Sequence, residues 1–198
     1  FDLQDYRDVI SNELIDELDY KREAKYQQLF HDVFKAEPNI IIPKLKIEYC
    51  DKGHIVMDYE QGDSIKKFCE YATEKQKIKA GNLISKFYME SMLKHNLIHA
   101  DPNPGNFSFR IVGDKVQLVV YDYGSCLKIS QSKCDALLSL YNEIKSHKGV
   151  ILPWLVAIGF KENLLLPIKE NLLAFLDLLF EPFTSDGRYY LQDWNRKD

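Results

Sequence analysis

Apolar residues recur every three or four positions through the first long segment of the chain, from Ser11 to Phe34. This spacing predicts an amphipathic helix with one buried side, and neither glycine nor proline interrupts it. Pro38 ends the pattern. A short helix is predicted to begin at Ser64, and a second long helix is predicted from Glu74 to Asn96.

Between and after these helices the pattern changes to short extended segments. The turn at 51–53 predicts a first hairpin, and alternating residues on both sides of Gly113-Asp114 predict a second one. From Ser130 onward the pattern is helical again, with interruptions at Pro153 and Pro167. A few strands followed mostly by helix indicate an α+β fold. The predicted extended segments are 40–43, 44–50, 54–59, 107–111 and 116–121.

The composition adds constraints on the class of protein. The chain has 198 residues, of which 45% are apolar and 13% aromatic, so it can bury a core. Its 26 Lys and Arg against 30 Asp and Glu give a net charge of −4, which disfavours nucleic acid as a ligand. Four cysteines without metal-site spacing predict reduced, mostly buried thiols in an intracellular protein. No stretch reaches the roughly 20 apolar residues of a membrane span.

A polar loop, HADPNPGN at 99–106, precedes the second hairpin, and the triplet DYG at 122–124 follows it. Because one strand runs out and the next runs back, Asn106 and Asp122 are expected at the same end of the hairpin. Phosphoryl transfer needs a carboxylate that orients the incoming hydroxyl and oxygen ligands for Mg²⁺. Asp101 suits the first role, and Asn106 with Asp122 suits the second. His99 is expected to be a scaffold residue rather than an acid or base.

Each of these residues taken alone could be an ordinary turn former beside the prolines. Their combination at this spacing, with Gly124, favours the phosphoryl-transfer interpretation. A second group of acidic residues, Asp16, Asp19 and Glu23, shares one face of the first predicted helix. It is either a solvated acidic face or the source of a carboxylate that pairs with an ATP-binding lysine.

The motifs ELDYKREA at 17–24, HADPNPGN and DYG together resemble the UbiB/AarF-related family of atypical protein-kinase-like proteins, over about residues 13–194. That family includes the mitochondrial ubiquinone-biosynthesis kinases. The loop motif alone is less specific, since aminoglycoside and choline phosphotransferases carry a similar one, and such a phosphotransferase is a weaker option. The resemblance implies a kinase-like fold, in which 1–60 is the remnant of an N-lobe with an αC-like helix and hinge strands, and 61–198 is a mainly helical C-lobe.

The resemblance also implies a role for each matching catalytic residue. Asp101 matches the catalytic-loop aspartate, and Asn106 and Asp122 match the Mg²⁺ ligands. Glu23 resembles the αC glutamate that pairs with the nucleotide-binding lysine. Two departures from the family pattern, Asn103 for a common histidine and Tyr123 for the usual phenylalanine, leave the metal ligands intact. The implied cofactors are ATP and Mg²⁺.

Regulatory and hinge residues follow from the same resemblance. Glu17 and Asp19 match an E-x-D motif that in relatives contacts an N-terminal extension and restrains kinase activity. The segment HIVMDYEQG, 54–62, looks like the gatekeeper and hinge. Met57 would lie behind the adenine. The edge of the adenine would be bound by backbone groups of Asp58, Tyr59 and Glu60.

The family's ATP-binding lysine would precede ELDYKREA, but only 16 residues precede Glu17 and none is a lysine. The chain is therefore expected to be cut at its front end rather than to have lost the upper lobe naturally. The implied function is a kinase or ATPase that supports ubiquinone or isoprenoid-lipid metabolism with a protein partner. Its implied location is mitochondrial in a eukaryote, and otherwise cytoplasmic or membrane-peripheral.

An alternative function is an inactive, pseudokinase-like module whose C-terminal half binds a lipid, a membrane surface or a partner protein. Aromatic and aliphatic residues are frequent there, for example Trp154, Phe160 and the segment 175–180. These residues equally suit the core of a kinase-like C-lobe.

Overall fold

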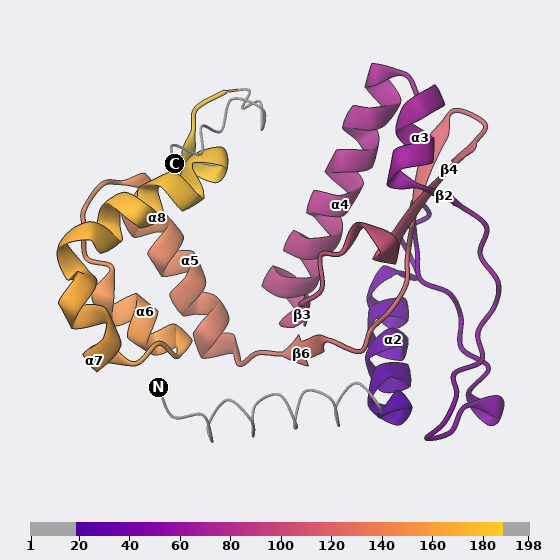
Figure 1. Ribbon diagram of the computed structural model, residues 1–198, viewed down its shortest axis with the longest axis horizontal. Coiled ribbons are helices and arrows are strands. Elements are labelled where there is room, and N and C mark those ends of the chain that lie inside the picture. Colours follow the sequence, from indigo (N-terminus) through magenta and orange to yellow (C-terminus); the bar gives the residue numbers. More distant parts are fainter. Residues whose placement is uncertain (1–18, 188–198) are drawn as a thin grey trace. The chain divides into compact units, whose positions relative to one another are not determined.

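The computed structural model describes residues 19–187 and has an α+β fold (Figure 1). The chain divides into two compact units, residues 1–128 and residues 129–198. All strands among the described residues lie in the first unit, and the described part of the second unit is helical. The α+β class predicted from the sequence is therefore confirmed.

A four-stranded sheet in the order β1-β5-β4-β2 forms the centre of the first unit. The strands β4 and β5 are antiparallel, and Val112 pairs with Lys115 around a two-residue turn in which Gly113 has a φ of +58°. This confirms the second predicted hairpin. The strand β1 joins β5 in parallel. The bounds are β1 Ile40–Ile41, β2 Asp63–Ser64, β4 Phe107–Val112 and β5 Lys115–Val120.

A second, two-stranded sheet pairs β3, Leu97–His99, with β6, Cys126–Lys128. The sequence pattern does not predict it, because strands of three residues are too short to show a periodicity. Its pairing holds the segment that enters the 99–106 loop beside the segment that leaves the DYG turn. The loop itself ends in one turn of 3₁₀ helix, Pro104–Asn106.

The helix α2, Tyr20–Phe34, starts later than the sequence predicts. Asp19 is its N-cap, with a non-helical φ of −89° and ψ of 76°, and its carboxylate accepts a hydrogen bond from the Arg22 amide. The prediction of one continuous helix from Ser11 is therefore wrong at Asp19, which also does not share a helical face with Glu23. Glu17 lies outside the described residues.

The other helices of the first unit begin at residues whose side chains cap them. Ser64 caps α3, Ile65–Tyr71, as predicted. Thr73 and Gln76 form a capping box at the start of α4, Glu74–His95, and Asn96 ends this helix in the left-handed conformation. These caps agree with the predicted helix positions.

The first predicted hairpin is present but short. Its only bridge joins Leu45 and Met57, with hydrogen bonds from the Lys46 amide to the Val56 carbonyl at 2.8 Å and from the Asp58 amide to the Lys44 carbonyl at 2.8 Å. Residues 47–49 leave the extended conformation and form a 3₁₀ turn. The expected strands at 44–50 and 54–59 are thus each reduced to a few residues.

Aromatic side chains from α2, α4, β4 and the DYG turn fill the core of the first unit. His99 is 2% exposed and lies among these rings, with centroid distances of 5.5 to 6.2 Å to five of them. The rings around it belong to Phe30, Phe87, Tyr88, Phe107 and Tyr123. His99 is therefore a buried packing residue, as expected.

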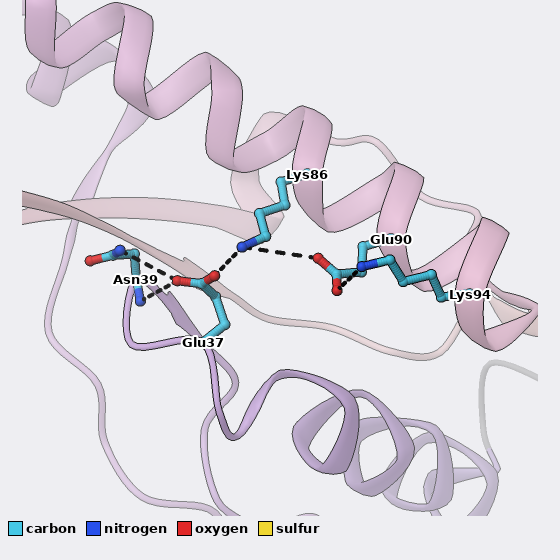
Figure 2. Close-up of polar contacts among 5 residues, drawn as sticks. All are labelled: Glu37, Asn39, Lys86, Glu90 and Lys94. Atoms are coloured by element: carbon cyan, nitrogen blue, oxygen red, sulfur yellow. Dashed lines mark hydrogen bonds and ion pairs between the residues drawn. The ribbon is translucent and has the colours of Figure 1, made fainter.

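A polar network on the surface ties the segment after α2 to α4 (Figure 2). Lys86 binds the Glu37 carboxylate, which also accepts hydrogen bonds from the Asn39 amide and side chain. Glu90 lies 4.0 Å from Lys86 and 2.8 Å from Lys94. The hydrogen bond from Lys86 lowers the pKa of Glu37. The network thus fixes the entry into β1 against α4.

The described part of the second unit consists of helices around an aliphatic core. Pro153 lies in the first turn of α6, where its missing amide costs little, so it starts a helix rather than interrupting one. None of the helices in residues 19–187 combines the length and apolarity that a membrane span requires. The helices are α5 Gln131–Lys145, α6 Leu152–Ile158, α7 Glu162–Leu165 and α8 Lys169–Thr184, and the core is Leu140, Ile144, Ile151, Leu155, Leu165, Leu172 and Leu176.

All four cysteines are free thiols. Cys126 and Cys134 are buried, as predicted, whereas Cys50 is half-buried and Cys69 is exposed. Burial raises the pKa of the Cys126 thiol well above its usual range. Cys126 is therefore a neutral core residue beside the DYG turn.

Candidate functional site

The loop from Asp101 to Asn106 is held by its own polar side chains. Asn106 Nδ2 donates to Asp101 Oδ2 at 2.8 Å, and the Asn103 amide donates to Asp101 Oδ1 at 3.1 Å. Asn103 Oδ1 in turn accepts from the Gly105 amide at 2.9 Å. Because the Asn106 amide nitrogen faces a carboxylate, its Oδ1 is the end that can bind a cation. Asn106 is 8% exposed, so its orientation is fixed by burial as well.

Asp122 adopts a left-handed backbone conformation, with a φ of 59°. A non-glycine residue in this conformation is uncommon and costs of order 1 kcal/mol or more, and such residues gather at functional sites. Two contacts hold it there. His99 Nε2 lies 2.7 Å from the Asp122 carbonyl, and Asp122 Oδ1 accepts from the Gly124 amide at 3.1 Å. Since a carbonyl can only accept, the Nε2 nitrogen of His99 carries the proton.

The hairpin register brings the loop and the DYG turn together. Phe107 pairs with Val120, and the Tyr121 amide donates to the Asn106 carbonyl at 2.8 Å. Asn106 and Asp122 therefore lie at the same end of the hairpin, as the sequence predicts. Asp101 joins them through its hydrogen bond to Asn106, so three of the predicted site residues lie in one region.

The first turn of α2 is fastened to the DYG turn by two adjacent side chains. Arg22 donates to the Gly124 carbonyl at 2.9 Å and to the Cys126 carbonyl at 3.0 Å. Glu23 Oε1 accepts from the Tyr123 amide at 3.3 Å. Burial raises the pKa of Glu23, the hydrogen bond from the Tyr123 amide opposes this rise, and the charge of Asp122 adds to it. Glu23 thus contacts the backbone beside Asp122.

The predicted hinge residues have different surroundings. The sulfur of Met57 accepts a hydrogen bond from buried Gln27, Asp58 pairs with Lys46 at 2.7 Å, and Tyr59 is 89% exposed. Glu60 is bound through its side chain and through its main chain. Arg110 pairs with its carboxylate at 2.8 Å, and the Tyr121 hydroxyl donates to its main-chain carbonyl at 2.7 Å.

Three residues in these contacts were not singled out from the sequence: Arg22, Arg110 and Tyr121. The last two are polar positions of the predicted hairpin, so the alternation of the strands could have placed them on one face. No local signal could have found the bonds from Arg22, because the first of its partners lies 102 residues away.

The donor set at the loop and turn suits a hard divalent cation. Carboxylate and amide oxygens are the ligands that Mg²⁺ takes, with the remaining positions filled by phosphate or water. Asn106 and Asp122 would hold such an ion. Among residues 19–187 no three or more His, Cys, Asp or Glu side chains gather into a metal cage.

The sequence model of the ABC1 atypical kinase-like domain matches residues 1–148 of the 198. This chain belongs to the ABC1 atypical kinase-like family, the group also described as UbiB/AarF. The match covers the ELDYKREA, HADPNPGN and DYG motifs. It favours this family over the aminoglycoside and choline phosphotransferases.

Curated relatives of the ABC1 domain have similar sequences. The chain is 28% identical over 156 residues to "Protein ACTIVITY OF BC1 COMPLEX KINASE 8, chloroplastic" of Arabidopsis thaliana. That alignment covers 77% of this chain and 20% of the relative. The chain is 25% identical over 119 residues to "Atypical kinase COQ8B, mitochondrial" of Danio rerio, in an alignment that covers 60% of this chain and 19% of the relative. The chain thus spans about a fifth of the length of these relatives.

A solved structure, the complex of Rv3197 with erythromycin from Mycobacterium tuberculosis, has a similar fold. The TM-score is 0.68 at 18% sequence identity, and the match covers 94% of this chain and 49% of that one. At this identity the likeness concerns the fold alone. Together with the family match it supports a kinase-like domain.

Proposed function

We propose that this domain binds Mg-ATP and is part of an atypical kinase or ATPase. The observation that carries the proposal is the arrangement of Asp101, Asn106 and Asp122, which the hairpin register gathers at one end of β4 and β5. Their oxygens are the ones that phosphoryl transfer uses. The ABC1 family match supports the same chemistry.

Each residue of this group has a distinct role in the proposal. Asp101 orients the hydroxyl or water that attacks the γ-phosphate and accepts its proton, and the hydrogen bond from Asn106 fixes its carboxylate. Asn106 and Asp122 hold Mg²⁺, which neutralises charge on the phosphates. Glu23 keeps the DYG turn in place through the Tyr123 amide. It also remains the proposed partner of a nucleotide-binding lysine.

The lobe assignment from the family resemblance is a further part of the proposal. Residues 1–60 would be the remnant of a kinase N-lobe, and residues 61–198 the C-lobe. Met57 would lie behind the adenine, and the backbone of 58–60 would bind its edge. Glu17 and Asp19 would restrain kinase activity, with Asp19 also capping α2.

The wider role follows from the relatives and is proposed at the level of the whole protein. We infer an organellar or cyanobacterial setting, because the similar proteins include chloroplastic, mitochondrial and Synechocystis ones. Support of ubiquinone or related isoprenoid-lipid metabolism, with a protein partner, is the pathway that the family resemblance suggests.

Nucleotide binding by the whole protein tests this proposal. Calorimetry with Mg-ATP is expected to give binding by the wild type and a loss of about tenfold or more for Asp122→Asn, which removes a charged Mg²⁺ ligand. Asp114→Asn is the matched control, since Asp114 lies in the turn at the opposite end of the same hairpin. Equal binding by wild type and Asp122→Asn contradicts the assigned metal ligand.

A second candidate function is a non-catalytic binding module. The second unit supports it, because large apolar side chains are exposed on its helices, with Phe175 and Phe183 on α8 each 60% exposed. These side chains would bind a lipid, a membrane surface or a partner protein. A folded whole protein that shows no ATP turnover would favour this function over the enzyme.

A further inference from the structure

The hairpin of β4 and β5 has two faces of different chemistry. Phe107, Phe109, Leu118 and Val120 are buried in the core of the first unit. Because side chains alternate along a strand, the intervening residues lie on the opposite face. Val119, which pairs with Ser108 on that face, is fully buried. The other residues there form the polar face of the hairpin: Ser108, Arg110, Gln117 and, one residue beyond β5, Tyr121.

The polar face of the hairpin binds the segment that follows the predicted hinge. Tyr121 donates from its hydroxyl to the Glu60 carbonyl at 2.7 Å, and Ser108 donates to the Tyr121 hydroxyl oxygen at 3.1 Å. Arg110 binds the Glu60 carboxylate at 2.8 Å and the Gln61 carbonyl at 3.2 Å. Glu60 is therefore held by its side chain and by its main chain at once.

Gly62 shows how closely this segment approaches the hairpin. A Cβ atom on Gly62 would lie 2.3 Å from Ser108 Oγ and 2.8 Å from Ser108 Cβ, so a side chain there would displace the segment. The same serine donates to Tyr121. Packing and hydrogen bonding thus fix residues 60–62 over one short stretch of β4, next to the residue that precedes Asp122.

The hydrogen bond from Tyr121 changes which hinge groups face a ligand. In the described part of the chain, the Asp58 carbonyl and the Glu60 amide make no hydrogen bond, whereas the Asp58 amide and the Glu60 carbonyl do. An adenine presents an amino donor and a ring-nitrogen acceptor on its Watson–Crick edge, which match one carbonyl and one amide. At the same two positions a guanine presents a carbonyl acceptor and a ring N–H donor. The order is reversed, so guanine needs an amide where adenine needs a carbonyl, and a carbonyl where adenine needs an amide.

We propose that Tyr121 is a positioning residue that makes the nucleotide site select adenine over guanine. Its hydroxyl engages the Glu60 carbonyl, which leaves the hinge with the Asp58 carbonyl as acceptor and the Glu60 amide as donor. This is the order that adenine needs and the reverse of the order that guanine needs. This inference rests on the proposed Mg-ATP site and specifies its base. Tyr121 acts through Glu60, so its effect belongs to the base and not to the phosphates, which lie with Asn106 and Asp122.

Three ligands separate the base from the phosphates: Mg-ATP, Mg-GTP and Mg-tripolyphosphate, each titrated into the whole protein. The variant Tyr121→Phe keeps the ring and removes the hydroxyl. We expect it to bind Mg-ATP about 3- to 10-fold more weakly, as the loss of one hydrogen bond predicts. Its preference for ATP over GTP is expected to fall, and its affinity for Mg-tripolyphosphate is expected to stay unchanged.

Tyr141→Phe is the matched control. The Tyr141 hydroxyl also donates to a main-chain carbonyl, that of Phe183 at 3.0 Å, but it lies in the second unit. This control is expected to leave all three affinities unchanged. Should Tyr121→Phe fail to fold, Ser108→Ala replaces it, because Ser108 orients the Tyr121 hydroxyl and its loss is expected to lower the ATP preference in the same direction.

The outcomes distinguish this inference from the proposed function. If the wild type binds Mg-ATP and Mg-tripolyphosphate but Tyr121→Phe keeps the wild-type ATP-to-GTP ratio, the role of Tyr121 is overturned and the metal site stands. An equal loss of all three ligands in Tyr121→Phe likewise overturns base selection, since it indicates a general structural effect. If the wild type binds none of the three ligands, both proposals fail.

Discussion

The candidate site and the second unit are stabilised by different kinds of contact. Around residues 99–106 and 121–126, polar side chains bind main-chain groups of other segments, as Arg22, Glu23 and His99 do. In the second unit, the core is aliphatic and helix faces with large apolar side chains remain exposed. The conformation of the site therefore depends on a few individual hydrogen bonds, whereas the helices of the second unit depend on many interchangeable packing contacts.

This difference explains how an unfavourable conformation persists at Asp122. A left-handed non-glycine residue is retained only where its surroundings determine it from several sides. Here His99 holds its carbonyl, and Arg22 and Glu23 hold the two residues that follow. All three contacts come from elements distant in sequence, so the fold shapes the turn in addition to the local hydrogen bond from the Gly124 amide to Asp122 Oδ1.

The largest expected effect is on the aromatic core that supports the site. Phe87 is fully buried and packs against Phe30, Phe34 and His99. We expect Phe87→Ala to lower the free energy of unfolding by about 3–5 kcal/mol, through lost burial and a cavity. Chemical denaturation measures this. Phe175→Ala is the matched change in the second unit, where the ring is 60% exposed, and an equal loss there would contradict the comparison.

The next effect tests the hydrogen bonds between α2 and the DYG turn. Arg22 reaches two carbonyls with its planar guanidinium, a geometry that lysine cannot reproduce. We expect Arg22→Lys to lower the free energy of unfolding by about 1–2 kcal/mol. It should also weaken Mg-ATP binding through the displaced turn. The control is Lys21→Arg at the neighbouring exposed position, and similar stabilities of the two variants would refute a specific role for the guanidinium.

The same difference explains which features the sequence predicts. The hairpin at 107–121 and the helices α3 and α4 follow from local patterns: alternation, a Gly-Asp turn and capping residues. The start of α2 after Asp19 is harder to predict, because two local signals disagree. The apolar spacing continues across Asp19 and indicates a helix interior, whereas its carboxylate favours an N-cap, which is the role that Asp19 has. Loop residues such as Asp101 and Asn106 can be identified by type and spacing, whereas the contacts of Arg22 and Tyr121 depend on the tertiary fold.

A smaller effect concerns the pH dependence of stability, which has opposite signs at two glutamates. Burial raises the pKa of Glu23, so its contribution to stability is present below its ordinary pKa near 4.5 and is lost as the pH rises through the raised value. Lys86 lowers the pKa of Glu37, so its contribution is present above pH 4.5 and is lost as the pH falls through the lowered value.

Two isosteric variants measure these opposite slopes. Relative to wild type, Glu23→Gln is expected to gain stability as the pH rises from about 4 to 7, because glutamine carries no buried charge. Relative to wild type, Glu37→Gln is expected to gain stability as the pH falls below about 4.5, where the wild-type ion pair is lost. Denaturation curves at several pH values give both differences. Slopes of the same sign for the two variants would show that the surroundings assigned to one of them are wrong.

The smallest expected effect lies at the outer end of the surface network in Figure 2. Lys94 is 66% exposed and binds Glu90, which keeps Lys86 as a second cation 4.0 Å away. We therefore expect Lys94→Ala to change the free energy of unfolding by less than about 0.5 kcal/mol. Lys86→Ala should cost more, since it leaves the Glu37 carboxylate, only 20% exposed, without its cation. Because salt screens exposed ion pairs most strongly, we expect 1 M NaCl to remove a larger fraction of the Lys94→Ala effect than of the Lys86→Ala effect. A larger fractional loss for Lys86→Ala would mean that exposure does not control the strength of these pairs.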